Sequence, residues 1–167
     1  MGQNSRMTYG MTQNLVSAAL TKGTTSTYTT TVTTAGCING KFVTTLAAQT
    51  NTASPTTDAV TGLPFVALGI NKATVLVYGQ TAAGAIQLAQ GSIEDTLPGV
   101  TTTVGPFIRA PQFPALPDDY LPLAYLLVRT APSASSWTAG TSSWTATGVT
   151  ASAVVNVSTL PDRPQTS

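Results

Sequence analysis

The side chains of this chain that could act as acids or bases are few, and their spacing offers little chemistry. There are six carboxylates and no histidine among 167 residues, and four of the carboxylates form two adjacent pairs, Glu94–Asp95 and Asp118–Asp119. A glycosidase needs two carboxyl groups that face each other about 5–10 Å apart, whereas neighbours on a strand point to opposite faces. Only Glu94 facing Asp118 across a cleft would meet that requirement. We therefore expect solvated loop charges, no catalytic residue and no enzymatic activity.

A metal or phosphate site has equally little support in the sequence. Without histidine the chain has no His-dependent triad and no imidazole ligand for a metal. Asp118–Asp119 with loop carbonyls could contribute to a calcium site, but the spacing of an EF-hand is absent. Gly79 and Gly84 are five residues apart, but the Lys and the Ser or Thr of a phosphate loop do not follow them. We interpret that segment as a turn, and we expect no resident metal and no cofactor.

Aromatic side chains in the C-terminal half offer the remaining chemistry, which is stacking. Trp137 and Trp144 are seven residues apart with Gly140 between them, and this spacing predicts a hairpin with both indoles on one side. With Tyr120 and Tyr125 they could form a platform for a sugar. Indoles at such mirrored positions more commonly belong to a core or an interface, and that is the interpretation we favour.

The composition favours a structural protein over an enzyme. Charged residues make up 8% of the chain, against roughly 25% in typical soluble domains, and threonine contributes 32 residues. The net charge is +1 and the basic residues are scattered, whereas nucleic-acid phosphates require clustered bases, so we expect no nucleic-acid partner. Cys37 is the only cysteine, which rules out an intramolecular disulfide, and we expect it to be a small buried residue. So little charge suits a chain that buries much of its surface in a homo-oligomer or a larger lattice.

Short apolar and β-branched segments separated by turn signals run along most of the chain. The Asn39–Gly40 pair predicts a tight hairpin, and residues 73–78 are apolar enough to predict a central strand buried on both faces. The prolines of residues 92–122 predict an irregular or edge segment, because proline cannot donate to a central ladder. We expect strands at residues 24–34, 41–48, 65–70, 73–78, 85–90, 123–130 and 149–157, with a loop at 49–64. The pattern predicts an all-β fold, a β-sandwich or barrel-like domain of about eight short strands.

One segment near the N-terminus has a different period. Across residues 12–22, the apolar side chains of Met11, Leu15, Val16 and Leu20 recur at helical spacing. This spacing predicts a short amphipathic helix. Its apolar stripe could dock on the core of the same chain or on a neighbouring subunit.

The expected organisation is one β-rich domain with two terminal extensions. We place an N-terminal arm with the possible helix at residues 1–22, the β-rich domain at 23–160 with a possible sub-boundary near residue 98, and a C-terminal tail at 161–167. No stretch approaches the roughly 18 consecutive apolar residues of a membrane span, and the N-terminus lacks the pattern of a signal peptide. We therefore expect synthesis in a cytoplasm and no membrane partner.

Several structural motifs resemble those of small virion proteins of tailed bacteriophages. The shared arrangement is a proline, an apolar strand, a glycine–threonine pair and a proline-rich end. In this chain the residues concerned are Leu116–Pro117, Leu121–Val128, Trp137, Gly140–Thr141 and Val157–Pro164, together with Ile38–Lys41, Thr57–Gly62 and Gly79–Gly91.

This resemblance implies a β-rich, trimeric subunit of the virion, and within that class a capsid decoration (cement) protein. Such a protein would bind the major capsid protein on the outer surface of the head and stabilise the lattice by binding rather than catalysis. The partners expected on this basis are a homotrimer of the chain itself and the major capsid protein. The expected contact residues are the arm residues Met11, Leu15, Val16 and Leu20 and the anchors Tyr125, Trp137 and Trp144.

Two other functions remain open from the sequence. A tail, baseplate or fibre component would use a similar threonine- and glycine-rich β domain. A carbohydrate-binding or receptor-binding β domain would depend on an exposed aromatic patch.

Overall fold

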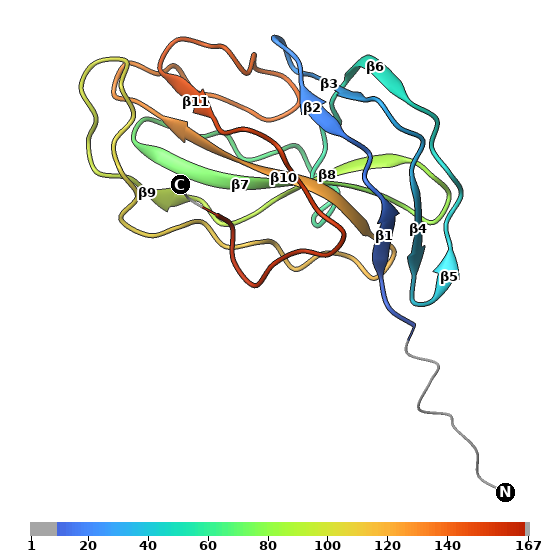
Figure 1. The fold of residues 1–167 in the computed structure, drawn as a ribbon. Coiled ribbons are helices and arrows are strands. Elements are labelled where there is room, and N and C mark those ends of the chain that lie inside the picture. Colours follow the sequence, from blue (N-terminus) through green and yellow to red (C-terminus); the bar gives the residue numbers. More distant parts are fainter. Residues whose placement is uncertain (1–9, 166–167) are drawn as a thin grey trace, which may run out of the picture.

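The computed structural model describes residues 10–165, and in that part of the chain all regular secondary structure is β. Residues 1–9 of the expected N-terminal arm lie outside the described residues. Three sheets form without closing into a barrel, which confirms the all-β fold and is consistent with a β-sandwich (Figure 1). The part of the structure that is described contains no helix with the length and hydropathy needed to span a bilayer.

Twelve strands make up the three sheets, and every pairing between them is antiparallel. The largest sheet has the order β11-β10-β7-β8, with β12 also pairing with β10 and β9 with β7, and the smaller sheets have the orders β1-β4-β5 and β2-β3-β6. The strands are β1 (Gln13–Val16), β2 (Leu20–Lys22), β3 (Thr27–Thr30), β4 (Ala35–Ile38), β5 (Lys41–Phe42), β6 (Gln49–Ala53), β7 (Lys72–Gln80), β8 (Ile86–Gln90), β9 (Glu94–Asp95), β10 (Leu121–Thr130), β11 (Val149–Ala151) and β12 (Val155–Asn156).

The two long strands β7 and β10 form the centre of the molecule. Their register runs from Leu121 opposite Gln80 to Arg129 opposite Ala73, and nearly all of their residues are buried. β7 combines β-branched and aromatic residues, which pack well on a pleated surface, and β10 is mainly leucine and other apolar residues. Pro122 lies at an irregularity in this register, where its missing N–H costs the ladder least. The predicted central strand at residues 73–78 is thereby confirmed.

The central sheet is buried on both faces because its side chains alternate between two apolar clusters. Leu76 and Tyr78 face a cluster completed by β2, β3 and the tryptophan-containing segment, and Val75 and Val77 face a second cluster on the other side. The proline-rich segment and the C-terminal residues cover that second face, where the ring of Phe113 meets that of Tyr125 edge-on at 5.0 Å. The irregular segment predicted from its prolines therefore packs over one face of the sheet and buries it.

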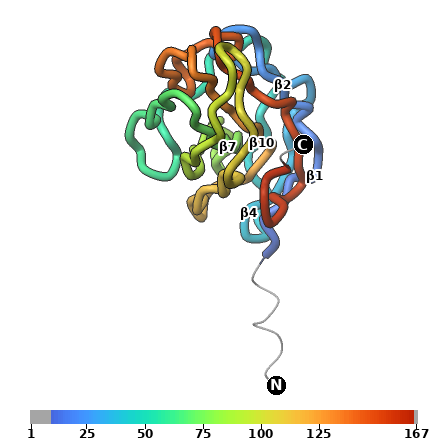
Figure 2. Tube along the Cα trace, turned by 90° about the vertical axis from the view of Figure 1, so that its left-hand side faces the viewer, coloured from blue at the N-terminus to red at the C-terminus, as the bar shows by residue number. Residues whose placement is uncertain are grey.

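The N-terminal and C-terminal parts of the described chain lie side by side (Figure 2). The backbone N–H of Asn14 donates to the carbonyl of Ser158 at 2.8 Å. Leu20 and Asn156 exchange two hydrogen bonds, in which the Leu20 N–H donates to Oδ1 at 2.7 Å and Nδ2 donates to the Leu20 carbonyl at 3.1 Å. Residues 13–22 are thus integrated into the β domain, and the boundary expected at residue 22 is wrong.

The short helix predicted for residues 12–22 is also wrong. The segment forms β1 and β2, separated by Ala19 with a φ of 46°. Apolar residues in so short a run fit helical and extended spacing equally well. The strand pairings with β4 and β3 decide the outcome, because they place Asn14 and Leu20 inside the molecule while Leu15 points outward.

Other elements match the predictions in part. The Asn39–Gly40 hairpin between β4 and β5 is confirmed, with φ values of 50° and 75° at the two turn residues. Residues 49–53 form β6 where a loop was predicted, because their backbone pairs with β3. Residues 65–70 form no strand, and Leu68 makes only an isolated bridge to Trp137. The expected return strand at 41–48 is limited to Lys41–Phe42.

Candidate interaction surface at the β1–β4–β5 sheet

The structure does not bring the acidic residues together for catalysis. Glu94 lines a hollow of about 280 Å³ with Asp95, Ile108 and Arg109, whereas Asp118 lines a different one. Asp95 is engaged in an ion pair with Lys72. Glu94 and Asp118 therefore do not face each other across one cleft.

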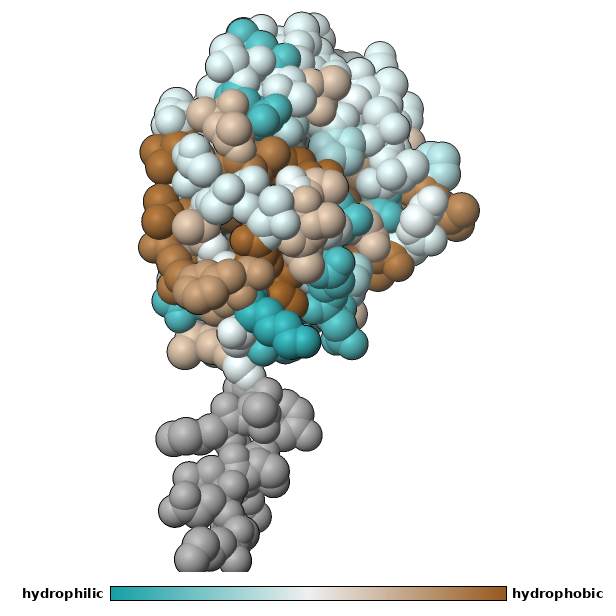
Figure 3. All heavy atoms as spheres, turned by 90° about the vertical axis from the view of Figure 1, so that its right-hand side faces the viewer, coloured by the Kyte–Doolittle hydropathy of each residue, from teal (hydrophilic) through white to brown (hydrophobic). Residues whose placement is uncertain are grey.

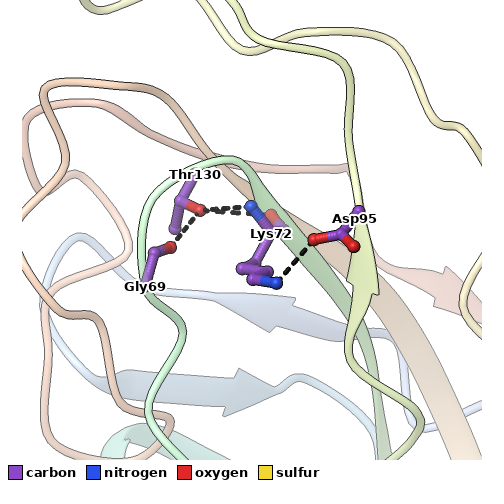
Figure 4. A network of polar contacts seen from close by, with 4 residues as sticks. All are labelled: Gly69, Lys72, Asp95 and Thr130. Carbon is purple, nitrogen blue, oxygen red and sulfur yellow. Dashed lines mark hydrogen bonds and ion pairs between the residues drawn. The ribbon is translucent and has the colours of Figure 1, made fainter.

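The Lys72–Asp95 pair belongs to a network that ties the start of β7 to the end of β10 (Figure 4). The hydroxyl of Thr130 accepts a hydrogen bond from the Lys72 N–H at 3.0 Å and donates to the Gly69 carbonyl at 2.6 Å. The Lys72 and Asp95 side chains are both substantially exposed, and such surface pairs contribute under about 1 kcal/mol. We assign this network to structure.

Two of the other carboxylates, Asp119 and Asp58, have structural partners. Within residues 10–165 there is no group of three or more His, Cys, Asp and Glu side chains that could hold a metal ion. Asp119 Oδ1 accepts from the Ala82 N–H at 2.9 Å and holds the turn between β7 and β8. Asp58 is buried and accepts four hydrogen bonds, from two backbone N–H groups of its own turn, the Thr61 hydroxyl and the Gln90 N–H.

The aromatic residues proposed as anchors or as a sugar platform are buried within the chain. The ring centroids of Trp137 and Trp144 lie 5.3 Å apart in one core cluster. The indole N–H of Trp137 donates to the Ser143 carbonyl, and that of Trp144 donates to the Thr27 carbonyl. Tyr125 is in the opposite cluster. None of the three presents its ring to the surface, so their assignment as interface anchors is corrected, and the segment between the tryptophans consists of turns rather than the predicted hairpin.

Tyr120, the fourth aromatic residue of the suggested platform, is buried as well. Its hydroxyl donates to the Val77 carbonyl at 2.6 Å, and burial raises its pKa well above the usual value for tyrosine. The ring is therefore a support beneath β7 and not a binding platform.

The arm residues named from the sequence divide into two groups. Leu20 is fully buried in the core, so its assignment to a docking stripe is corrected. Met11, Leu15 and Val16 remain exposed. The division follows from the pairing, since Leu20 lies in β2 and faces the core, whereas an irregularity of β1 between Asn14 and Val16 leaves both Leu15 and Val16 exposed.

The exposed group is part of a larger apolar face on the β1–β4–β5 sheet. Residues directly opposite each other in a sheet share a face, and the register places Gln13 opposite Cys37, and Cys37 opposite Phe42. Phe42 is 83% exposed, and the exposed Leu15 lies at an irregularity of β1 next to Val16, which pairs with Ala35 of β4.

We call the set Met11, Leu15, Val16, Cys37 and Phe42 the β1–β4–β5 surface. Figure 3 shows hydrophobic residues gathered on this side of the molecule. The inward residues of the same sheet, among them Ile38, pack on Leu121 and Leu123 of β10, so the sheet presents its outer face on a fixed support.

Phe42 was missed from the sequence. The available signal was its place immediately after the Asn39–Gly40 turn and Lys41, where the hairpin register sets it opposite Cys37. Cys37 itself is half-buried rather than buried, and its Sγ donates to the Met11 carbonyl at 3.2 Å.

A hollow of about 280 Å³ adjoins Phe42 and carries charges of both signs. Its lining combines apolar groups with one lysine and two aspartates: Ile38, Asn39, Lys41, Phe42, Ala82, Asp118 and Asp119. The only ion pair among the described residues joins Lys72 and Asp95, so Lys41 and the aspartates border the same hollow without pairing. This arrangement can accept an apolar group flanked by charges.

Comparisons with known proteins found no matching family model, no matching curated protein and no matching solved structure.

Proposed function

We propose that this chain is a non-enzymatic structural subunit that acts by docking on a larger assembly through the β1–β4–β5 surface. The observation that carries this proposal is the exposure of Phe42 beside exposed Met11, Leu15 and Val16. Contiguous apolar patches on a folded protein commonly mark interaction sites, whereas single exposed apolar side chains are ordinary.

The surface is held in a form suited to binding without rearrangement. The Asn39–Gly40 turn adopts the positive φ angles of a tight hairpin, and the Gly40 N–H donates to the Met11 carbonyl at 3.3 Å. Binding to a rigid surface loses little conformational entropy, which leaves more of the apolar contact energy available for affinity.

The assembly that we propose is the head of a tailed bacteriophage, with the chain as a capsid decoration protein on its outer surface. This part of the proposal is supported by the resemblance to small virion proteins and by a charged fraction of 8%, which suits close packing of copies. The partner would be the major capsid protein, and the homotrimer implied by the resemblance stays a prediction. The glycan-binding alternative loses support because Tyr120, Tyr125, Trp137 and Trp144 are buried.

The test is co-sedimentation of the purified chain with phage heads that lack it, with detached tails as the parallel sample. Saturable binding to heads is the expected result. Binding only to tails would move the chain to a tail, baseplate or fibre, and binding to neither would contradict the proposal.

Two variants identify the surface responsible. Phe42→Ala should weaken binding about 30-fold, because truncating a central anchor costs about 2 kcal/mol or more. Val66→Ala removes another exposed apolar side chain outside the β1–β4–β5 surface and should leave binding unchanged. Equal effects of the two substitutions would show that this surface is not the docking site.

A further inference from the structure

We propose that the β1–β4–β5 surface binds a second copy of this chain in a twofold-symmetric contact, with Lys41 of each copy facing Asp118 of the other. This inference rests on the proposed function, since it concerns the same surface: two free chains pair through it, and the capsid protein replaces the second copy when the chain docks on a head. It is carried by the charges around the hollow and by the position of Phe42.

The charge arrangement is self-complementary under a twofold axis. Lys41 and Asp118 border one hollow but do not form an ion pair within the described part of the chain. In a twofold contact the same patch meets itself, so each residue of one copy meets a different residue of the other. A patch that carries separated charges of both signs can then form two equivalent ion pairs, whereas a patch with one sign of charge would repel its copy.

The hollow is large enough for an aromatic ring from the second copy. An apolar cavity of about 150 Å³ can hold benzene, and this hollow has about 280 Å³. Phe42 projects at its border with 83% of its surface exposed. The twofold contact would seat Phe42 of each copy over the hollow of the other, which covers the most exposed aromatic side chain of the described residues.

Asp118 is a better site than Asp119 for testing this contact. Asp119 already accepts a hydrogen bond from the Ala82 N–H, so its replacement would disturb the turn. The backbone of Asp118 lies in an exposed turn, and its charge can be reversed without removing a hydrogen bond found in the structure.

The experiment uses the full chain and measures its mass by sedimentation velocity across a range of micromolar concentrations. The wild-type chain should form dimers rather than the homotrimer that the resemblance to virion proteins implies. In Lys41→Glu the acidic side chain at position 41 would face Asp118 of the other copy, and in Asp118→Lys the basic side chain at position 118 would face Lys41. Because like charges then face each other, each variant should dimerise at least about tenfold more weakly than the wild type. An equimolar mixture of the two variants should restore the dimer, because the acidic side chain at position 41 in one variant then faces the basic side chain at position 118 in the other.

The control is Asp162→Lys, which makes the same charge change at an exposed position away from the hollow and should dimerise like the wild type. Restoration in the mixture also shows that both charge variants are folded. A wild-type monomer, a trimer, or a mixture no better than its components would each overturn the twofold contact.

The outcomes also separate this inference from the proposed function. A wild-type monomer that still binds heads through Phe42 would overturn the twofold contact and leave the docking function intact, with the capsid or residues 1–9 of the same chain as occupant of the surface. A dimer that binds neither heads nor tails would support the twofold contact and contradict the virion assignment.

Cys37 provides an independent readout within the same surface. It lies opposite Phe42 in the register and is half-buried, so a second copy seated there should slow its reaction with a thiol reagent as protein concentration rises. The Lys41→Glu variant alone should show no such slowing, and addition of Asp118→Lys chains should restore it. A reaction rate independent of concentration in the wild type would overturn the proposal.

Discussion

Replacing Leu20 and Leu15 separately with alanine distinguishes the two-strand arrangement of residues 13–22 from a helix. Leucines five residues apart lie about 140° apart around a helix, so in a helix docked on the core both would lie at the edges of its apolar stripe and would contribute similarly to stability. In the structure Leu20 is fully buried against the main core, whereas Leu15 is 50% exposed on the outer face. The same substitution should therefore have very different effects at the two positions.

The magnitude follows from the burial of each side chain. Leu20→Ala removes three carbon groups from the core, which is about 2.4 kcal/mol at about 0.8 kcal/mol each. The cavity left behind raises the cost to about 3–4 kcal/mol. Leu15→Ala removes a half-exposed side chain and should cost under about 1 kcal/mol.

Urea denaturation followed by tryptophan fluorescence measures both effects, because Trp137 and Trp144 lie in the cluster that contains Leu20. With a denaturant slope of about 2 kcal/mol per molar urea, the midpoint should fall by about 1.5–2 M for Leu20→Ala and by less than about 0.5 M for Leu15→Ala. Comparable shifts for the two variants would refute the strand assignment and restore the helix.

Two further predictions concern the central sheet. Gly79→Ala should lower the free energy of unfolding by about 3 kcal/mol or more, because the new Cβ would clash with a ring carbon of Tyr120 and lie 2.6 Å from the Leu121 carbonyl oxygen. The control is Gly69→Ala, where a new Cβ would have no atom within 4 Å. Equal thermal midpoints for the two variants would contradict this packing. Burial raises the pKa of Tyr120, so its contribution to stability is fully present below the unfolded pKa of about 10. That contribution is lost above this pKa, at about 1.4 kcal/mol per pH unit. Urea denaturation between pH 9 and 11 should show that loss, and Tyr120→Phe should reduce its slope by one tyrosine; an unchanged slope would contradict the assignment.

The central part of the fold could be predicted from the sequence because its signals are local and unambiguous. Residues 73–78 combine β-branched and aromatic side chains, and residues 123–128 are a continuous apolar run. Short runs of this kind between turn signals are consistent with strands buried on both faces. The Asn39–Gly40 turn was equally clear, because both residues tolerate positive φ. These elements specify strands whatever lies around them.

The candidate surface could be predicted only in part, because it depends on pairings between distant segments. Val16 and Leu20 are four residues apart, the spacing of one helical face, and only the pairing of β1 with β4 and of β2 with β3 leaves Val16 exposed and Leu20 buried. Phe42 is exposed because of its register with Cys37. Trp137 and Trp144 were ambiguous between core and interface, and the surrounding strands that decide their burial lie more than 100 residues earlier, as the bond from Trp144 to Thr27 shows.

The hydrogen bonds between the two ends of the described chain bear on how the protein is made. The side chain of Asn14 donates to the Val157 carbonyl across a separation of 143 residues. A ribosome adds about 5–20 residues per second, so about 7–30 s pass between synthesis of these two partners. During that interval β1 and β2 lack the C-terminal segment that pairs with their backbone, and the native structure can be completed only after residue 158 has been synthesised. The time for which these strands are exposed in the cell is therefore determined by the speed of translation and not by the folding rate of the domain.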